Sequence, residues 1–189
     1  MTPIIVVGGI IVVILYSLYA GLIKKRNGAL EALSSIDVQL KMRSDLIPNI
    51  LTIAKKYMEH EKEVLTTVTE LRNRADAAYD KTNPADVSEH FAVASQLASQ
   101  MGKLQVTMEA YPTIKADQTM TEAQRSYNEV EARIAAARRG YNASVTALNN
   151  AVQIFPGSAI ASAINIKAMP FFETDEASKA PVNAASILN

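Results

Sequence analysis

Hydrophobic positions divide the chain into an unbroken apolar block near the N-terminus and a longer region of helical periodicity. The block runs from Ile4 to Ile23 and contains no charged residue. A helix of that length rises about 30 Å, which matches the hydrocarbon thickness of a bilayer. A lone segment in lipid satisfies its own backbone hydrogen bonds only as a helix, so the pattern predicts a transmembrane helix.

The C-terminal flank of this block has the composition of a membrane–water interface. Tyr16 and Tyr19 lie toward the end of the block, and Lys24, Lys25 and Arg26 follow it directly. Aromatic residues followed by basic residues are typical of that interface, and the basic residues favour its cytoplasmic side. We therefore expect a single-pass anchor with a short N-terminus outside and the remaining chain in the cytoplasm. A cleaved signal peptide is disfavoured because no basic residue stands ahead of the apolar block.

Apolar residues then recur at steps of three and four, which predicts an all-α domain. Each such series of apolar residues forms a seam along one face of a helix, and the seam from Ile47 to Ala78 lacks one apolar residue, at Glu61. The seams comprise Leu30, Leu33, Ile36 and Leu40; Ile47, Ile50, Ala54, Tyr57, Val64, Val68, Leu71, Ala75 and Ala78; Val87, Phe91, Ala94, Leu97, Ala98, Met101, Leu104 and Met108; and Tyr127, Val130, Ile134, Ala137, Tyr141, Val145, Leu148 and Val152. Four amphipathic helices with short links predict a long up-and-down four-helix bundle.

The first helix allows two arrangements at Pro48. Proline lacks a backbone N–H, and it disfavours the helical conformation at the preceding residue. Asp45 could cap a new helix with Pro48 in its first turn, in which case the fourth helix returns toward the membrane. Otherwise one long helix is kinked at Pro48, and the chain ends far from the membrane.

The other helix boundaries have clearer signals. Either Thr82 or Asn83 is available to cap the next helix, and Pro84 predicts its start. Tyr111 and Pro112 end the third helix, and the spacing Thr121-x-x-Gln124 fits a capping box at the start of the fourth.

The C-terminal region is apolar but too short and interrupted to span a bilayer. It packs on its own bundle, or else it contacts a neighbouring subunit or lipid. Ile164, Phe171 and Phe172 are the candidate oligomer contacts. The expected organisation is an anchor with its basic flank at 1–26, a helical bundle at 27–155, an apolar tail at 156–173 and a flexible C-terminus at 174–189.

Charge and residue types exclude several functions. The chain has 19 basic and 19 acidic residues, and this balance argues against binding to nucleic acid. Cysteine is absent, so disulfides, cysteine nucleophiles and thiolate metal sites are excluded. His60 and His90 each follow a glutamate, which lies on another helix face, and we expect both histidines to face solvent. No phosphate loop or nucleophile elbow occurs, so the sequence predicts no enzyme, no cofactor and no metal site.

Several motifs together resemble the LemA family of bacterial membrane proteins. They are Ile36–Ile50 (IDVQLKMRSDLIPNI), His60-Glu61, Tyr111–Ala116 (YPTIKA), Glu131–Asn142 (EARIAAARRGYN), Phe155-Pro156 and Pro170–Glu173 (PFFE). The motif residues singled out as structural are Asp37, Gln39, Asp45, Pro48, Asn49, Tyr111, Pro112, Arg138, Tyr141 and Asn142. The chain departs from the family pattern at Met42, Ser44, Gly140 and Leu148.

The resemblance implies a four-helix bundle behind one span of the bacterial inner membrane, with no established enzyme activity. Some members of the family are linked to magnetosome membranes. Our leading hypothesis is a membrane-anchored structural protein that self-associates into a scaffold, with the lipid bilayer and further copies of the chain as its partners. The alternative is an adaptor that docks a separate, unknown protein.

Overall fold

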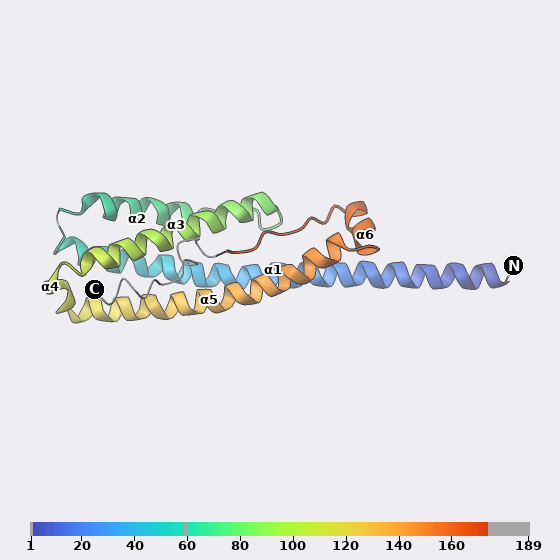
Figure 1. Cartoon of the computed structure of the whole chain (residues 1–189), viewed down its shortest axis with the longest axis horizontal. Helices are drawn as coiled ribbons and strands as arrows, with labels where there is room; N and C mark the ends of the chain where they lie inside the picture. Colours follow the sequence, from blue (N-terminus) through green and yellow to red (C-terminus); the bar gives the residue numbers. More distant parts are fainter. Residues whose placement is uncertain (1, 59, 174–189) are drawn as a thin grey trace, which may run out of the picture.

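The computed structural model describes residues 2–58 and 60–173, and all regular secondary structure within these residues is helical. Figure 1 shows a rod in which one helix runs the full length and projects at its N-terminal end beyond all the others. This confirms the all-α fold with a long apolar N-terminal helix. The helices are α1 (Thr2–Lys55), α2 (Lys62–Ala75), α3 (Pro84–Met108), α4 (Pro112–Lys115), α5 (Gln118–Gln153) and α6 (Gly157–Ala163).

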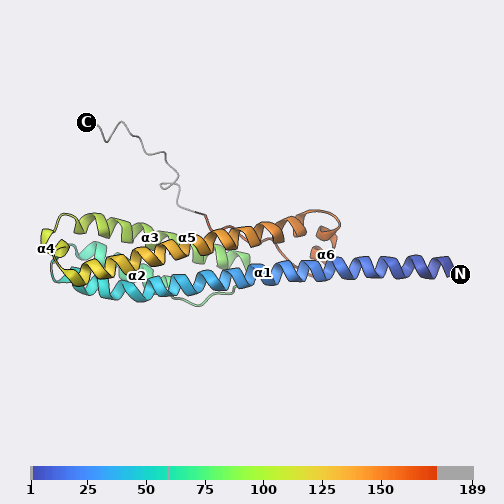
Figure 2. The ribbon, with the colours of Figure 1, turned by 90° about the horizontal axis from the view of Figure 1, so that it is seen from below.

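The long helices run up and down along the rod. α5 packs along α1, and α2 packs along α3. The single turn of α4 lies at the end of the rod far from the N-terminus, and α5 returns from there toward the apolar part of α1 (Figures 1 and 2). α6 then contacts both α5 and α1. The last helices therefore lie beside the first one rather than at the far end.

The chain reverses direction after α1, and neither the predicted turn at Asp45 nor the predicted kink at Pro48 describes this reversal. Pro48 lies inside α1, so a new helix does not begin at Asp45. α1 ends at Lys55 and α2 begins at Lys62, so the turn includes Glu61, where the apolar seam misses its step. The seam therefore belongs to two antiparallel helices. For this reason the fourth long helix returns toward the N-terminal end even though α1 is continuous through Pro48.

A side chain from α2 compensates for the hydrogen bond that Pro48 removes from α1. Pro48 has no N–H to donate to the carbonyl of Ser44, four residues earlier. The Nε of Arg72 donates to that carbonyl at 2.9 Å. The proline is thus tolerated within the helix, and the free carbonyl becomes a docking point for α2.

The helix caps agree in part with the sequence expectations. Asn83 caps α3 by accepting a hydrogen bond from the N–H of Ala85, and Pro84 is the first helical residue, as predicted. The predicted start of the fourth long helix at Thr121 was wrong, because Asp117 caps α5 by accepting hydrogen bonds from the N–H groups of Thr119 and Met120. Thr121 instead lies inside the first turn.

Two hydrophobic clusters follow one another along the bundle. The cluster nearer the N-terminus includes Leu22, Leu33, Phe91 and Tyr141, and the other surrounds the α1–α2 turn at the far end. Most of the expected seam positions are buried in α3 and α5, which confirms the helical periodicity, while Ala98, Ala137 and Val152 are partly buried; the buried positions are Val87, Phe91, Ala94, Leu97, Met101, Leu104 and Met108, and Tyr127, Val130, Ile134, Tyr141, Val145 and Leu148.

The apolar tail lies against its own bundle as far as the structure describes it. Ala161, Met169 and Phe172 belong to the cluster nearer the N-terminus. Phe172, one of the candidate oligomer contacts, is 5% exposed because it packs within its own subunit, which agrees with the first of the two arrangements considered for the tail. The segment 174–189, expected to be flexible, lies outside the described residues.

Candidate functional site

Two asparagine side chains of α5 hold the tail by its backbone. The amide of Asn149 donates to the carbonyl of Met169 and accepts from its N–H, both at 2.9 Å. Asn142 makes the same pair of bonds with Phe172, at 3.1 and 2.9 Å. Tyr141 adds a hydrogen bond from its hydroxyl to the carbonyl of Pro170 at 2.8 Å.

The spacing of these contacts follows from helix and strand geometry. Asn142 and Asn149 are two helical turns apart, so they project from the same face and are separated by about 10 Å along α5. Three residues of extended chain, from Met169 to Phe172, cover about 10 Å as well. The tail therefore runs antiparallel to α5, with one backbone unit opposite each amide. We call the contacts of Tyr141, Asn142 and Asn149 with the tail the tail clamp.

Aromatic packing supplies the apolar part of the same contact. The Phe172 ring stacks on Phe91 with centroids 4.2 Å apart, and Tyr141 meets Phe91 edge-on at 5.3 Å. The Arg138 guanidinium lies 6.0 Å from the centre of the Phe172 ring. Two sequence motifs that are 30 residues apart thus meet in space, through Arg138, Tyr141 and Asn142 of one and Phe172 of the other.

A second polar group joins α1 to α3 and to the loop that precedes α3. Asp37 accepts a hydrogen bond from the hydroxyl of Tyr79 at 2.8 Å and forms an ion pair with Lys81. His90 lies on the other side, with Nε2 3.7 Å from the Asp37 carboxylate and its ring stacked on Tyr79 at 4.1 Å. The expectation that His90 faces solvent was wrong, because its side chain is only 9% exposed. His60 is exposed, as expected.

Burial and charge set the protonation of this group. Loss of solvent lowers the pKa of His90, while the Asp37 carboxylate raises it and Lys81 and Arg43 lower it further. Burial and the hydrogen bond to Asp37 raise the pKa of Tyr79. Near neutral pH, His90 is therefore a neutral ring beside the Asp37–Lys81 ion pair.

Arg43 is a buried cation in the middle of the bundle. Its guanidinium donates to the carbonyl of Ala94 at 2.9 Å and to the carboxylate of Glu131 at 3.4 Å. The side chain is 3% exposed, whereas that of Glu131 is 33% exposed. A buried charge needs such partners, so Arg43 ties α1 to both α3 and α5.

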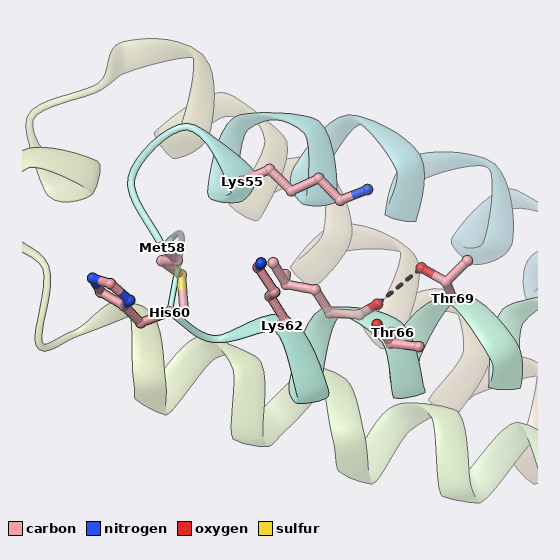
Figure 3. A pocket seen from close by; sticks show the side chains of 7 residues that line it. Lys55, Met58, His60, Lys62, Thr66 and Thr69 are labelled. Carbon is pink, nitrogen blue, oxygen red and sulfur yellow. Dashed lines mark hydrogen bonds between the residues drawn. The ribbon is translucent and has the colours of Figure 1, made fainter.

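One cavity adjoins these contacts, and another lies at the α1–α2 turn. One, of about 300 Å³, is lined by Asp37, Arg43, Tyr79, Lys81 and His90 among others. The larger, of about 870 Å³, is open and lies at the α1–α2 turn, where Lys55, Met58, His60 and Lys62 are among the lining residues (Figure 3). Within residues 2–58 and 60–173, no three acidic, histidine or cysteine residues lie close enough together to hold a metal ion.

The remaining motif residues occupy separate places. Asp45 is exposed and forms a salt bridge with Lys41 at 2.7 Å. Asn49 is exposed rather than buried between helices, and Gln39 is half-buried. The Tyr111 hydroxyl donates to Glu61 at 3.3 Å, so it links the two loops at the far end of the rod, and Pro112 opens α4.

Sequence reasoning missed Arg43, Tyr79, His90 and Asn149. Two of them left a signal. Arg43 continues the apolar spacing of Ile36 and Leu40, which marks it as a charge on a buried face. Asn149 follows Asn142 by two turns, which places both on one face. The aromatic stack of Tyr79 on His90 joins a loop to a helix, and periodicity within one helix does not reveal such a contact.

The N-terminal part of α1 has the surface of a membrane helix. Its apolar window is long enough to cross a bilayer and is not covered by the rest of the chain. Tyr16 and Tyr19 are exposed at 70% and 43%. Lys24 and Lys25 are also exposed, and Arg26 is half-buried. The fold and this surface define a class: helical rods with one apolar helix that extends beyond the bundle.

Comparison with known proteins identifies the family within this class. The model of the LemA family matches residues 32–185, so the chain belongs to the LemA family. Two magnetosome proteins of Paramagnetospirillum magneticum, MamQ 1 and MamQ 2, are each 30% identical to it over 82 residues. That match covers 43% of this chain but only 30% of each relative. Together with the apolar helix, the family indicates a membrane-associated protein.

Proposed function

We propose that this protein is a membrane-anchored structural protein whose helical rod associates with further copies of itself to form a scaffold. The structural role is supported mainly by one observation: side chains of the family motifs contact other parts of the same chain. Asp37 joins α1 to α3, and Tyr141 and Asn142 hold the tail on α5. These side chains make a long, stiff rod, and catalysis plays no part in the proposal.

The proposed position is the inner membrane of a bacterium, with residues 4–23 crossing the bilayer. The N-terminus lies outside and the rod projects into the cytoplasm. Lys24, Lys25 and Arg26 support this orientation because basic residues next to a span favour the cytoplasmic side. The similarity to two magnetosome proteins supports a role at a membrane.

Apolar side chains on the outside of the rod support self-association. Val38 and Met42 lie one turn apart on α1 and are 52% and 42% exposed. Phe171 and Ile164, two of the expected contacts, are 45% and 37% exposed. A second copy that covered these side chains would remove apolar surface from water, which stabilises association by about 25 cal/mol for each Å² buried.

The mass of the purified chain in detergent, measured by light scattering over a range of concentrations, tests self-association. We expect a defined oligomer, and Val38→Glu together with Met42→Glu should shift it toward monomer. The matched control is Ala136→Glu, at an exposed position on α5. A monomer at every concentration would overturn the scaffold, and a one-to-one crosslink to another protein in membranes would instead indicate an adaptor.

A further inference from the structure

The junction between α5 and α6 carries large apolar side chains that nothing in the described chain covers. Ile154 is 63% exposed and Phe155 is 80% exposed. The junction is tightly built, since a Cβ atom at Gly157 would overlap the carbonyl of Ala151. The two side chains therefore project from a fixed corner of the backbone, which we call the α5–α6 corner.

The α5–α6 corner lies beside the end of the apolar block, not beside the polar part of α1. α6 contacts α1, and its Ala161 shares a hydrophobic cluster with Leu22. Leu18, Gly21 and Ile23 are partly covered as well, whereas residues 3–17 are exposed. Both views place α6 alongside the N-terminal, blue part of α1 (Figures 1 and 2).

This position sets the corner below the membrane surface. The block from Ile4 to Ile23 is only just long enough to cross the hydrocarbon core of about 30 Å, so Leu18 and Leu22 must lie within it. From Leu18 to Lys24 the helix rises about 9 Å. A segment packed at this level enters the bilayer to a similar depth, which is the depth at which interfacial segments bind, about 5–10 Å.

The composition of the segment fits that environment. No charged residue occurs between Arg139 and Lys167, so the end of α5, the corner and α6 bring no charge into the lipid. The first cation after the corner, Lys167, lines the same cavity of about 370 Å³ as Arg26, the last cation of the basic flank, and Asp80 is the one acidic residue in that lining. On both α1 and the chain after α6, the apolar surface therefore ends at a basic residue, and these two residues lie close together.

We propose that the α5–α6 corner is a second membrane contact, in which Ile154 and Phe155 enter the lipid while Arg26 and Lys167 face anionic headgroups. The inference rests on the membrane anchoring in the proposed function but not on self-association. The contact would fix the tilt of the rod, since two points attach it to the bilayer instead of one. The tail clamp connects this contact to the body of the rod because it ties the chain after α6 back onto α5.

Tryptophan fluorescence in vesicles of phosphatidylcholine and phosphatidylglycerol tests the proposal on the full chain. The chain has no tryptophan, so Phe155→Trp introduces a single reporter at the corner. Val106→Trp is the matched control, since Val106 is 69% exposed near the far end of α3. Ile11→Trp reports on the anchor itself.

We expect the tryptophan at 155 to emit at shorter wavelength than the one at 106, and only the former to be quenched by lipids brominated on the acyl chains. Long-wavelength emission without quenching at 155 would overturn the proposal. Short-wavelength emission without lipid quenching would also overturn it, because the corner would then be covered by a second copy. An unquenched tryptophan at 11 would show that the anchoring itself is wrong.

Discussion

Replacing Asn149 with leucine tests whether side-chain amides hold the tail on α5. Leucine keeps a similar volume but removes both hydrogen bonds to Met169. The N–H and the carbonyl of Met169 would then be buried without partners, at a cost of about 1–3 kcal/mol each. We expect the free energy of unfolding to fall by about 2–4 kcal/mol, which corresponds to about 5–15 °C in melting temperature for a chain of this size.

The matched control is Asn150→Leu, because Asn150 is the next residue but is exposed. It should change the melting temperature in detergent by no more than a few degrees, since surface substitutions stay within about 0.5 kcal/mol. Amide hydrogen exchange adds a local measurement, and the N–H of Met169 should exchange faster in Asn149→Leu. If the tail leaves the bundle, water satisfies the freed groups and the global effect shrinks, but the faster exchange persists. Unchanged melting together with unchanged exchange at Met169 would refute the clamp.

Two further variants test the polar contacts between helices. Arg43→Met should lower the free energy of unfolding by about 2–4 kcal/mol, because it leaves the carbonyl of Ala94 buried without a donor and Glu131 without its cation. The control is Lys41→Met, at a nearby exposed position. Equal melting temperatures of the two variants would contradict a buried role for Arg43. The pKa of His90 is lowered in the folded chain, so the unfolded chain binds more protons below about pH 6.5 and stability falls as the pH drops through this range. His90→Phe should remove part of the loss in melting temperature between about pH 7.5 and about pH 5.5, whereas His60→Phe should not, and equal pH dependence in wild type and His90→Phe would contradict the assignment.

The periodicity of the sequence predicts the helices well because burial repeats with the helical turn. The apolar seams of α3 and α5 largely coincide with the buried residues, and the apolar block is a helix that the rest of the chain covers only near the end of the block, around Leu22. The reversal between α1 and α2 was also encoded, in the missing seam step at Glu61. It was misplaced because proline is a stronger local signal for a break than one absent apolar residue.

The polar contacts could not be predicted to the same extent, because they join residues from different helices. Asp37 pairs with Tyr79 and Lys81 only after the reversal brings the α2–α3 loop back beside α1. Asn142 lies on a helix, yet its hydrogen-bond partner is the backbone of the tail rather than another helix. The position of a polar residue on a helix face indicates how deeply it is buried, but not which backbone or side-chain group lies opposite.

Pro48 shows how a local defect becomes a tertiary contact. Proline inside a helix is unfavourable because it leaves an acceptor four residues earlier without its donor. Here that acceptor, the carbonyl of Ser44, receives the Nε of Arg72 from α2. Arg72 also lies within 3.6 Å of Asp76, which in turn is 3.5 Å from Lys41 on α1. A regular helix would offer α2 no free carbonyl at this level, so the proline helps to specify where the antiparallel helix docks. Pro48, which from the sequence favours a break in the helix, thus helps to fix how α2 packs on an unbroken α1.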